Sequence, residues 1–321
     1  MNPEVADAIG VLTEKRILSP GQSAMLLRVA RRDLVSVRFE LRALLYAGVL
    51  LAVSGAGLFL KENQERIGPV AIASLLAAAA FGCFVFVLRR SPPFSWNACG
   101  ESHVATDYLL LLAVLLVGSD LAYVESRFRF LGAQWSYHLL VLSVIALAAA
   151  YRFDSRVVLS LGLSSFAAWR GVSTRIPLES HLAGHPGEVR ANALACGVLF
   201  LAAALVSVRT KRKAHFEAVF AAFGWLLLFG GLLSGVFGDK PSWPLWEIAT
   251  CGAAAAVIAF AYRFRRLFDF TVGVIAGYLA LLRLWKAIIA TDQVFFLGVA
   301  VSSLAVVVLL AATYRTMRRQ A

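Results

Sequence analysis

The stretch GPVAIASLLAAAAFGCFVFVL, from Gly68 to Leu88, decides the fold of this chain. It contains no charged residue and is about as long as the 20 apolar residues that a helix needs to cross a bilayer. A strand of a membrane barrel would be shorter and would alternate apolar with polar residues, which this stretch does not do. Because backbone groups in hydrocarbon must be paired within the protein, the stretch predicts a membrane-spanning helix.

Comparable apolar stretches recur along the whole chain. Of its 321 residues, 60% are hydrophobic and only 16% are charged, with a mean hydropathy of +0.75. The sequence therefore predicts an all-α fold, a polytopic integral membrane helix bundle with about ten transmembrane helices. The predicted spans are 43–60, 68–88, 104–124, 135–151, 157–172, 191–208, 218–237, 245–262, 268–289 and 294–314.

The basic residues of the connecting loops predict the orientation. An even number of spans places both termini on one side, where loops and termini hold 21 of the 31 Lys and Arg residues, against 10 on the other side. The positive-inside rule then places both termini in the cytoplasm. The net charge of +12 is thus explained by loops that face anionic membrane lipids, and no nucleic-acid partner is predicted.

Residues 1–42 are predicted to form a cytoplasmic helical hairpin ahead of the transmembrane bundle at 43–321. Ser19 suits a helix N-cap, Pro20 the first helical position and Gln22 the reciprocal position of a capping box. Apolar residues then recur at alternating steps of four and three as far as Leu44. The alternatives are a basic amphipathic helix on the inner leaflet and a dimeric coiled coil. The hairpin is a candidate docking site for a protein partner.

A short sequence motif suggests an internal repeat. The tetrad Ala150–Phe153 (AYRF) recurs 111 residues later at Ala261–Phe264, in both cases where a predicted span ends on the cytoplasmic side. The predicted repeat units are 104–172 and 218–289, which would share one orientation, as in the parallel repeats of some transporters. The alternative is coincidence, because Tyr-Arg is ordinary chemistry at an inner membrane edge.

Polar and small residues at matching places of the two units suggest a cavity. Short or glycine-interrupted spans in corresponding repeats often mark a transporter binding site, although glycines also allow two helices to pack closely. The candidate cavity residues are Ser160, Gly162, Ser164, Arg170, Thr271, Gly273 and Arg283.

A few charged residues lie near the outer ends of the spans. Asp120 or Glu247 would neutralise Arg170 or Arg283 if they met inside the bundle, since unpaired charges in a membrane are costly. The alternative is that each side chain extends to the membrane surface on its own.

The sequence gives no motif for a cofactor or a catalytic centre. His181 and His185 have the one-turn spacing of two metal ligands, but Gly184 and Pro186 disfavour the helix that would place them together, so no metal site is predicted. Phosphate-binding loops, nucleophile elbows and H-E-x-x-H motifs do not occur. Enzymatic activity is therefore uncertain and is the least favoured class.

The N-terminal third resembles a family of bacterial multi-span membrane proteins, domain of unknown function 2157. The resemblance rests on Gly10–Leu12, on Ile17–Gln22 and on the glycines of the first span, Gly48 and Gly55–Gly57. It implies a cytosolic helical hairpin followed by many spans in the bacterial inner membrane, and it carries over no functional residue.

Two functional hypotheses remain. The first is a transport-type protein that moves a small solute or a lipid through a cavity between the repeat units. The second is a non-catalytic scaffold or sensor whose residues 1–42 dock a partner. Membrane lipids are the expected surroundings in both cases, and the sequence gives no oligomeric state.

Overall fold

The computed structural model divides the chain into two compact units, Met1–Phe59 and Leu60–Ala321. No strand occurs among the residues that it describes, which confirms the predicted all-α class. The described residues are 12–15, 17–19, 21–23, 25–26, 38–62, 68–96, 104–171, 186–238, 243–288 and 292–319.

Each predicted span coincides with one helix of the structure, although most of the helices extend a few residues beyond the prediction. Two short 3₁₀ helices, η1 (Gly132–Gln134) and η2 (Ala214–Phe216), lie in connections. The long helices of the described residues are α3 (Arg38–Glu62), α5 (Pro69–Arg90), α6 (Val104–Phe128), α7 (Tyr137–Phe153), α8 (Arg156–Gly171), α9 (Pro186–Thr210), α10 (Glu217–Gly238), α11 (Trp243–Arg263), α12 (Leu267–Ile288) and α13 (Asp292–Arg319).

Seven helices in the described part of the chain are long and apolar enough to cross a membrane. These seven are α5, α6 and α9 to α13. The apolar part of α3 (Ala43–Gly55), α7 and α8 are shorter, the last two having 17 and 16 residues. The multi-span class is thus established, whereas the count of about ten spans stays a prediction.

In the first unit, the capping box predicted at Ser19 is present. The backbone N–H of Gln22 donates to Ser19 Oγ at 3.3 Å, and the backbone N–H of Ser19 donates to Gln22 Oε1 at 3.0 Å. These reciprocal bonds satisfy two groups that the start of a helix leaves without partners. The predicted helix start is therefore confirmed, while the hairpin as a whole lies partly outside the described residues.

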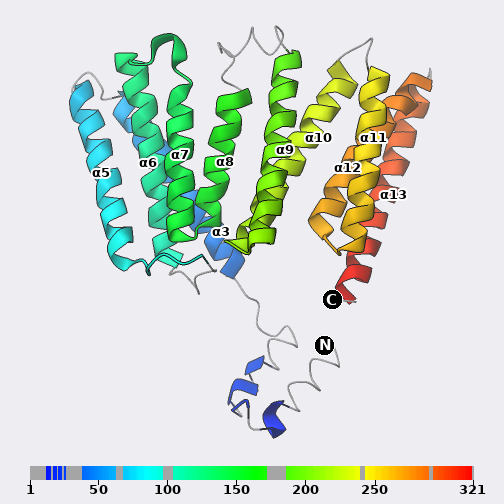
Figure 1. The fold of residues 1–321 in the computed structure, drawn as a ribbon, viewed down its shortest axis with the longest axis horizontal. Helices are drawn as coiled ribbons and strands as arrows, with labels where there is room; N and C mark the ends of the chain where they lie inside the picture. Colours follow the sequence, from blue (N-terminus) through cyan, green and yellow to red (C-terminus); the bar gives the residue numbers. More distant parts are fainter. Residues whose placement is uncertain are drawn as a thin grey trace. The chain divides into compact units, whose positions relative to one another are not determined.

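The second unit is a bundle in which helices that follow one another in the chain lie side by side and are linked by short connections (Figure 1). α5 packs on α6, α7 on α8, α9 on α10 and α11 on α12, so each pair forms a helical hairpin. Most of the described Lys and Arg residues gather at one end of these helices, here called the basic end. They are Arg89, Arg90, Arg152, Arg156, Arg209, Lys211, Arg212, Lys213, Arg263, Arg265, Arg266 and Arg315.

The α7–α8 and α11–α12 turns at the basic end have the same backbone geometry. Asp154 and Arg265, which are 111 residues apart, both adopt a left-handed conformation, with φ of 63° and 55°. The residue after each donates its N–H five residues back, from Ser155 to Ala150 at 3.2 Å and from Arg266 to Ala261 at 2.9 Å. The helix pairings within α6–α8 also recur within α10–α12. The two turns therefore match in geometry and in helix pairing, while the repeat itself stays a prediction.

The two predicted cavity glycines occupy matching helix crossings. A Cβ atom on Gly162 would lie 3.0 Å from Leu147 Cγ in α7, and one on Gly273 would lie 3.0 Å from Ile258 Cγ1 in α11. Leu147 and Ile258 are separated by the same 111 residues as the glycines. Ser143 Oγ also donates to the Gly162 carbonyl at 2.9 Å across the first crossing. Close packing of helices therefore accounts for both glycines.

Alanine at either crossing should destabilise the bundle. We expect Gly162→Ala and Gly273→Ala to cost about 1–3 kcal/mol each, because the added methyl group overpacks a helix contact. Gly252→Ala in α11 is the matched control, since that exposed position has no heavy atom within 4 Å of an added Cβ. Thermal unfolding of the purified protein in detergent measures the difference, and equal stability of all three variants would contradict the close packing.

The orientation is testable at two exposed positions on opposite ends of the bundle, Arg127 at the end of α6 and Arg209 at the end of α9. In a background in which the four native cysteines are replaced by serine, an impermeant maleimide added outside the cell should label Arg127→Cys and not Arg209→Cys, following the excess of basic residues inside. The reverse labelling pattern would overturn the predicted topology.

Candidate functional site

The polar residues of the predicted cavity satisfy their hydrogen bonds within their own helices. Ser160 Oγ donates to the Val157 carbonyl at 2.7 Å, and Thr271 Oγ1 donates to the Leu267 carbonyl at 2.9 Å. Ser164 is exposed and bonds to its own helix in the same way. Such bonds satisfy a hydroxyl without a ligand. The two pockets described below are lined by none of the seven predicted cavity residues, so that cavity stays a prediction.

Among the described charged residues at the opposite end, no direct salt bridge joins the predicted partners, but Arg283 lies near enough to Glu247 to interact with its charge. The guanidinium groups of Arg170 and Arg283 lie 5.7 and 5.2 Å from the ring centres of Trp169 and Trp243. Glu247 is only 6% exposed, and neither carboxylate oxygen has a hydrogen-bond partner in the described part of the chain. If the Glu247 side chain extended to the membrane surface, its carboxylate would be exposed. The burial of Glu247 therefore disfavours this alternative.

At the basic end, three residues from two connections form a buried ionic group, here called the Asp154 cluster (Asp154, Lys213 and His215). Lys213 Nζ donates to Asp154 Oδ1 at 2.9 Å, and Lys213 is only 1% exposed. His215 Nε2 lies 2.6 Å from the same oxygen, but the ring is poorly aligned for a hydrogen bond. Because a buried ammonium group is costly without a counter-ion, Asp154 is what allows Lys213 to be buried.

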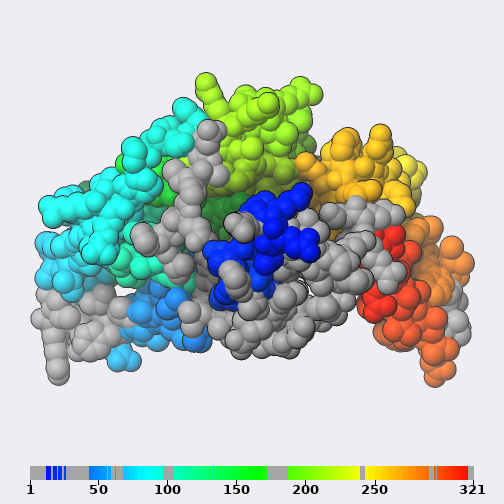
Figure 2. Space-filling view, turned by 90° about the horizontal axis from the view of Figure 1, so that it is seen from below, coloured from blue at the N-terminus to red at the C-terminus, as the bar shows by residue number. Residues whose placement is uncertain are grey.

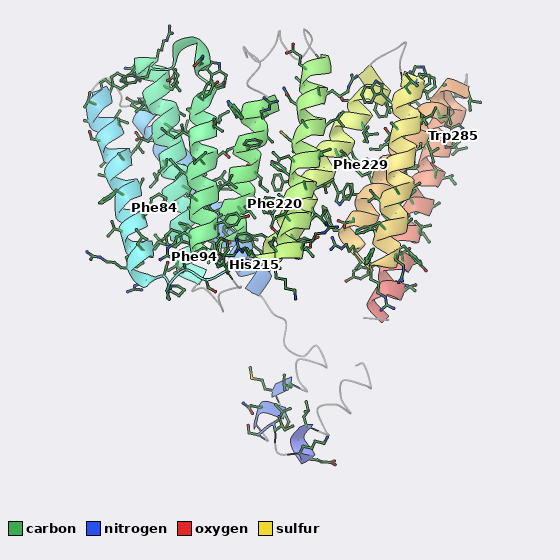
Figure 3. All side chains as sticks on the ribbon, in the orientation of Figure 1. Phe84, Phe94, His215, Phe220, Phe229 and Trp285 are labelled. Carbon is green, nitrogen blue, oxygen red and sulfur yellow. The ribbon has the colours of Figure 1, made fainter. Side chains whose placement is uncertain are left out.

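Aromatic residues enclose this lysine. Lys213 Nζ lies 5.4 Å from the ring centre of Phe94 and 6.0 Å from that of Phe216, within range of a cation–π interaction. The backbone N–H of Lys213 donates to the Trp96 carbonyl at 2.8 Å. Figure 3 shows Phe94 and His215 at the same edge of the bundle. The segment after α5 is therefore held against the α9–α10 connection.

A second ionic group, the Glu217 cluster (Glu217, Arg266 and Asp269), joins α10 to the α11–α12 turn. Arg266 Nη1 donates to Glu217 Oε1 and lies 3.7 Å from Asp269 Oδ2. Asp269 is only 4% exposed and also hydrogen-bonds with Trp225. With all three groups ionised the cluster carries a net charge of −1, which leaves one carboxylate without a balancing cation.

A pocket of about 190 Å³ adjoins the Glu217 cluster. Its polar residues lie together, and its other walls are apolar or aromatic side chains from α9, α10 and α11. Because Leu205, Val208 and Phe260 are exposed, the pocket opens on the apolar surface of the bundle. The lining residues are Leu201, Ala204, Leu205, Val208, Glu217, Ala221, Trp225, Phe260, Arg266 and Asp269.

One short segment, residues 213–217, takes part in both ionic clusters. Lys213 and His215 contact Asp154 of the α7–α8 turn, while Glu217 contacts Arg266 of the α11–α12 turn. The α9–α10 connection therefore ties together the two turns that the predicted repeat makes equivalent. Figure 2 views this end of the unit, where α5 in cyan and the α9–α10 region in yellow-green reach the surface.

Sequence reasoning missed both clusters. The sequence analysis makes no prediction for Asp154, Glu217 or Asp269. The usable signal was their sign, because each is an acidic residue close to Lys and Arg at the basic end. In the described part of the chain, no group of three or more His, Cys, Asp or Glu is placed to hold a metal ion. The pair His181 and His185 lies outside the described residues.

These features define the class: a polytopic α-helical membrane protein with buried ionic clusters at one end. A family model described as "Predicted membrane protein (DUF2157)" matches residues 11–159, from the first unit to the start of α8. This match confirms the resemblance expected from the N-terminal third and extends it beyond the first hundred residues. No curated protein and no solved structure matches the chain.

Removal of the buried lysine should strongly destabilise the basic end. We expect Lys213→Met to cost about 3–5 kcal/mol, because it leaves Asp154 buried without its cation. Lys211→Met, two residues away at an exposed position, should change stability by about 0.5 kcal/mol or less. Thermal unfolding in detergent compares the two variants, and similar midpoints for both would contradict the pairing.

Proposed function

We propose that this chain is a transport-type protein of the bacterial inner membrane that binds and moves an amphipathic molecule, with both termini in the cytoplasm. The observation that carries the proposal is the pocket at the Glu217 cluster. It combines an ionic end with apolar walls, and it opens on the surface that would face lipid. A molecule with a polar head group and an acyl chain has the matching distribution of polar and apolar surface.

The dimensions of the pocket favour a small head group. A volume of about 190 Å³ is below the range of about 300–1,000 Å³ that is usual for small-molecule sites, which is too little for a whole lipid. The head group would therefore enter alone, while its chain lies along exposed Leu205, Val208 and Phe260. Because the cluster has two carboxyl groups and one guanidinium, a head group that carries an amine finds more acceptors there than one that is only anionic.

The matched hairpins give indirect support for movement of the ligand. The α7–α8 and α11–α12 turns share one backbone geometry, and the glycine crossings of Gly162 and Gly273 correspond. Parallel duplications of this kind are one way in which transporters are built, with one unit moving against the other.

The alternative function is a scaffold or sensor that docks a protein partner through residues 1–42. Its support is the helix start at Ser19, which shows ordered local structure at the predicted place. A scaffold needs no pocket among the membrane helices, so movement of lipid separates the two functions.

The proposal predicts movement of an amine-bearing lipid between leaflets. The full chain is reconstituted in phosphatidylethanolamine–phosphatidylglycerol vesicles that contain phosphatidylethanolamine with a fluorescent NBD group on its acyl chain. Dithionite, which destroys only the fluorophores it can reach, should bleach a larger fraction than in protein-free vesicles. Glu217→Gln should slow this movement by about tenfold, since it removes a charge-assisted contact to the head group.

The matched control is Glu188→Gln, an exposed glutamate at the opposite end that lines neither pocket. This variant should move lipid at the wild-type rate. Equal bleaching with and without the wild-type protein would contradict lipid movement. An unchanged rate for Glu217→Gln would show that the pocket takes no part in this movement.

A further inference from the structure

A second cavity lies at the opposite end of the bundle, where α6 ends and α7 begins. Its volume is about 640 Å³, within the usual range for small-molecule sites of about 300–1,000 Å³. It shares no lining residue with the pocket at the Glu217 cluster, and none of its residues was predicted to form a site. The lining residues are Ala122, Glu125, Ser126, Arg129, Gly132, Trp135 and His138.

The carboxylate of Glu125 is held in place by the turn that lines this open cavity. The backbone N–H of Leu131 donates to Glu125 Oε2 at 3.1 Å, and the N–H of Arg129 donates to the Glu125 carbonyl at 3.0 Å. Glu125 is only 9% exposed, and its carboxylate has no second hydrogen bond in the described part of the chain. One oxygen is therefore positioned by the protein, and the other remains available to a donor from a ligand.

Trp135 and His138 add two further groups that favour a cation. Their ring centres lie 5.5 Å apart, and His138 Nδ1 contacts the Trp135 carbonyl at hydrogen-bond distance. A proton on Nδ1 makes that contact a donated bond and leaves Nε2 as an acceptor in the neutral ring. An indole face also attracts ammonium groups. A carboxylate, an imidazole nitrogen and an indole together are suited to a primary ammonium group.

Arg129 gives the same cavity a positive charge. Its side chain is exposed, and its backbone adopts a left-handed conformation with φ of 49° directly after α6. A ligand with a single cation would be repelled by this guanidinium, whereas a ligand that also carries an anionic group would be held at both ends.

We propose that this cavity binds a zwitterionic head group, with a primary ammonium at Glu125 and an anionic phosphate or carboxylate at Arg129. The shared chemistry fits both the head group of phosphatidylethanolamine and a small free zwitterion. The inference does not rest on the proposed function, because a site of this kind binds its ligand whether or not the protein moves lipid.

The test measures how the purified full chain binds two ligands, a free zwitterion and phosphatidylethanolamine. Isothermal titration in detergent uses O-phosphoethanolamine, which is the head group without its chains. Native mass spectrometry uses protein released from nanodiscs that contain phosphatidylethanolamine, or phosphatidylcholine, whose quaternary ammonium has no N–H donor. The site should bind O-phosphoethanolamine or retain phosphatidylethanolamine in preference to phosphatidylcholine.

Two substitutions locate the site. Glu125→Gln keeps an acceptor for the Leu131 N–H but removes the charge, so it should weaken binding about tenfold or more without unfolding the turn. Arg129→Gln should weaken binding to a similar degree. Glu188→Gln is the control at the same end and should bind as the wild type does.

The possible results distinguish a free zwitterion from a lipid head group as the ligand, and they also show whether the site exists. Binding of O-phosphoethanolamine alone identifies a free zwitterion as the ligand, and retention of phosphatidylethanolamine alone identifies the lipid. Absence of both, or binding that Glu125→Gln and Arg129→Gln leave unchanged, would overturn the site. Each of these results is independent of the rate at which lipid moves between leaflets.

Discussion

The ion pair between Lys213 and Asp154 is the interaction on which the basic end of the bundle depends. A lysine that is almost completely buried is tolerated only if its charge is compensated, and here one oxygen, Asp154 Oδ1, does this at 2.9 Å. The same segment then reaches Arg266 through Glu217. Two helical hairpins that are far apart in the sequence are thereby joined by five consecutive residues.

The sequence predicted the positions of the helices because the bilayer makes a single demand on every span. A stretch of about 20 apolar residues has no other stable structure in hydrocarbon, and so the helix from Pro69 to Arg90 could be located within two residues. The capping box at Ser19 and Gln22 was equally predictable, since both partners lie within one turn.

The ionic clusters could not be predicted in the same way. The partner of Lys213 is 59 residues away, and its choice depends on which turns meet at the basic end. The predicted cavity had the opposite difficulty: Gly162 and Gly273 were recognised as a matched pair, but the same residues suit a binding site and a close helix crossing. Only the positions of Leu147 and Ile258 against them favour packing.

The two pockets give the bundle a polar site at each end. The smaller one combines two carboxylates with a guanidinium, and the larger one combines a carboxylate with a guanidinium, an imidazole and an indole. Both arrangements suit head groups that carry charges of both signs. A molecule that exchanged between the leaflets of a membrane would meet comparable chemistry on either side.

Residues 213–217 hold the two hairpin turns in a fixed relation. Spin labels at exposed Arg156 in α8 and Arg263 in α11 measure the distance between those turns by pulsed electron paramagnetic resonance in nanodiscs. We expect a single narrow distance distribution for the otherwise wild-type protein. Replacement of both anions, Asp154→Asn with Glu217→Gln, should broaden it. A broad distribution before any replacement, or one that the double replacement leaves unchanged, would contradict the claim.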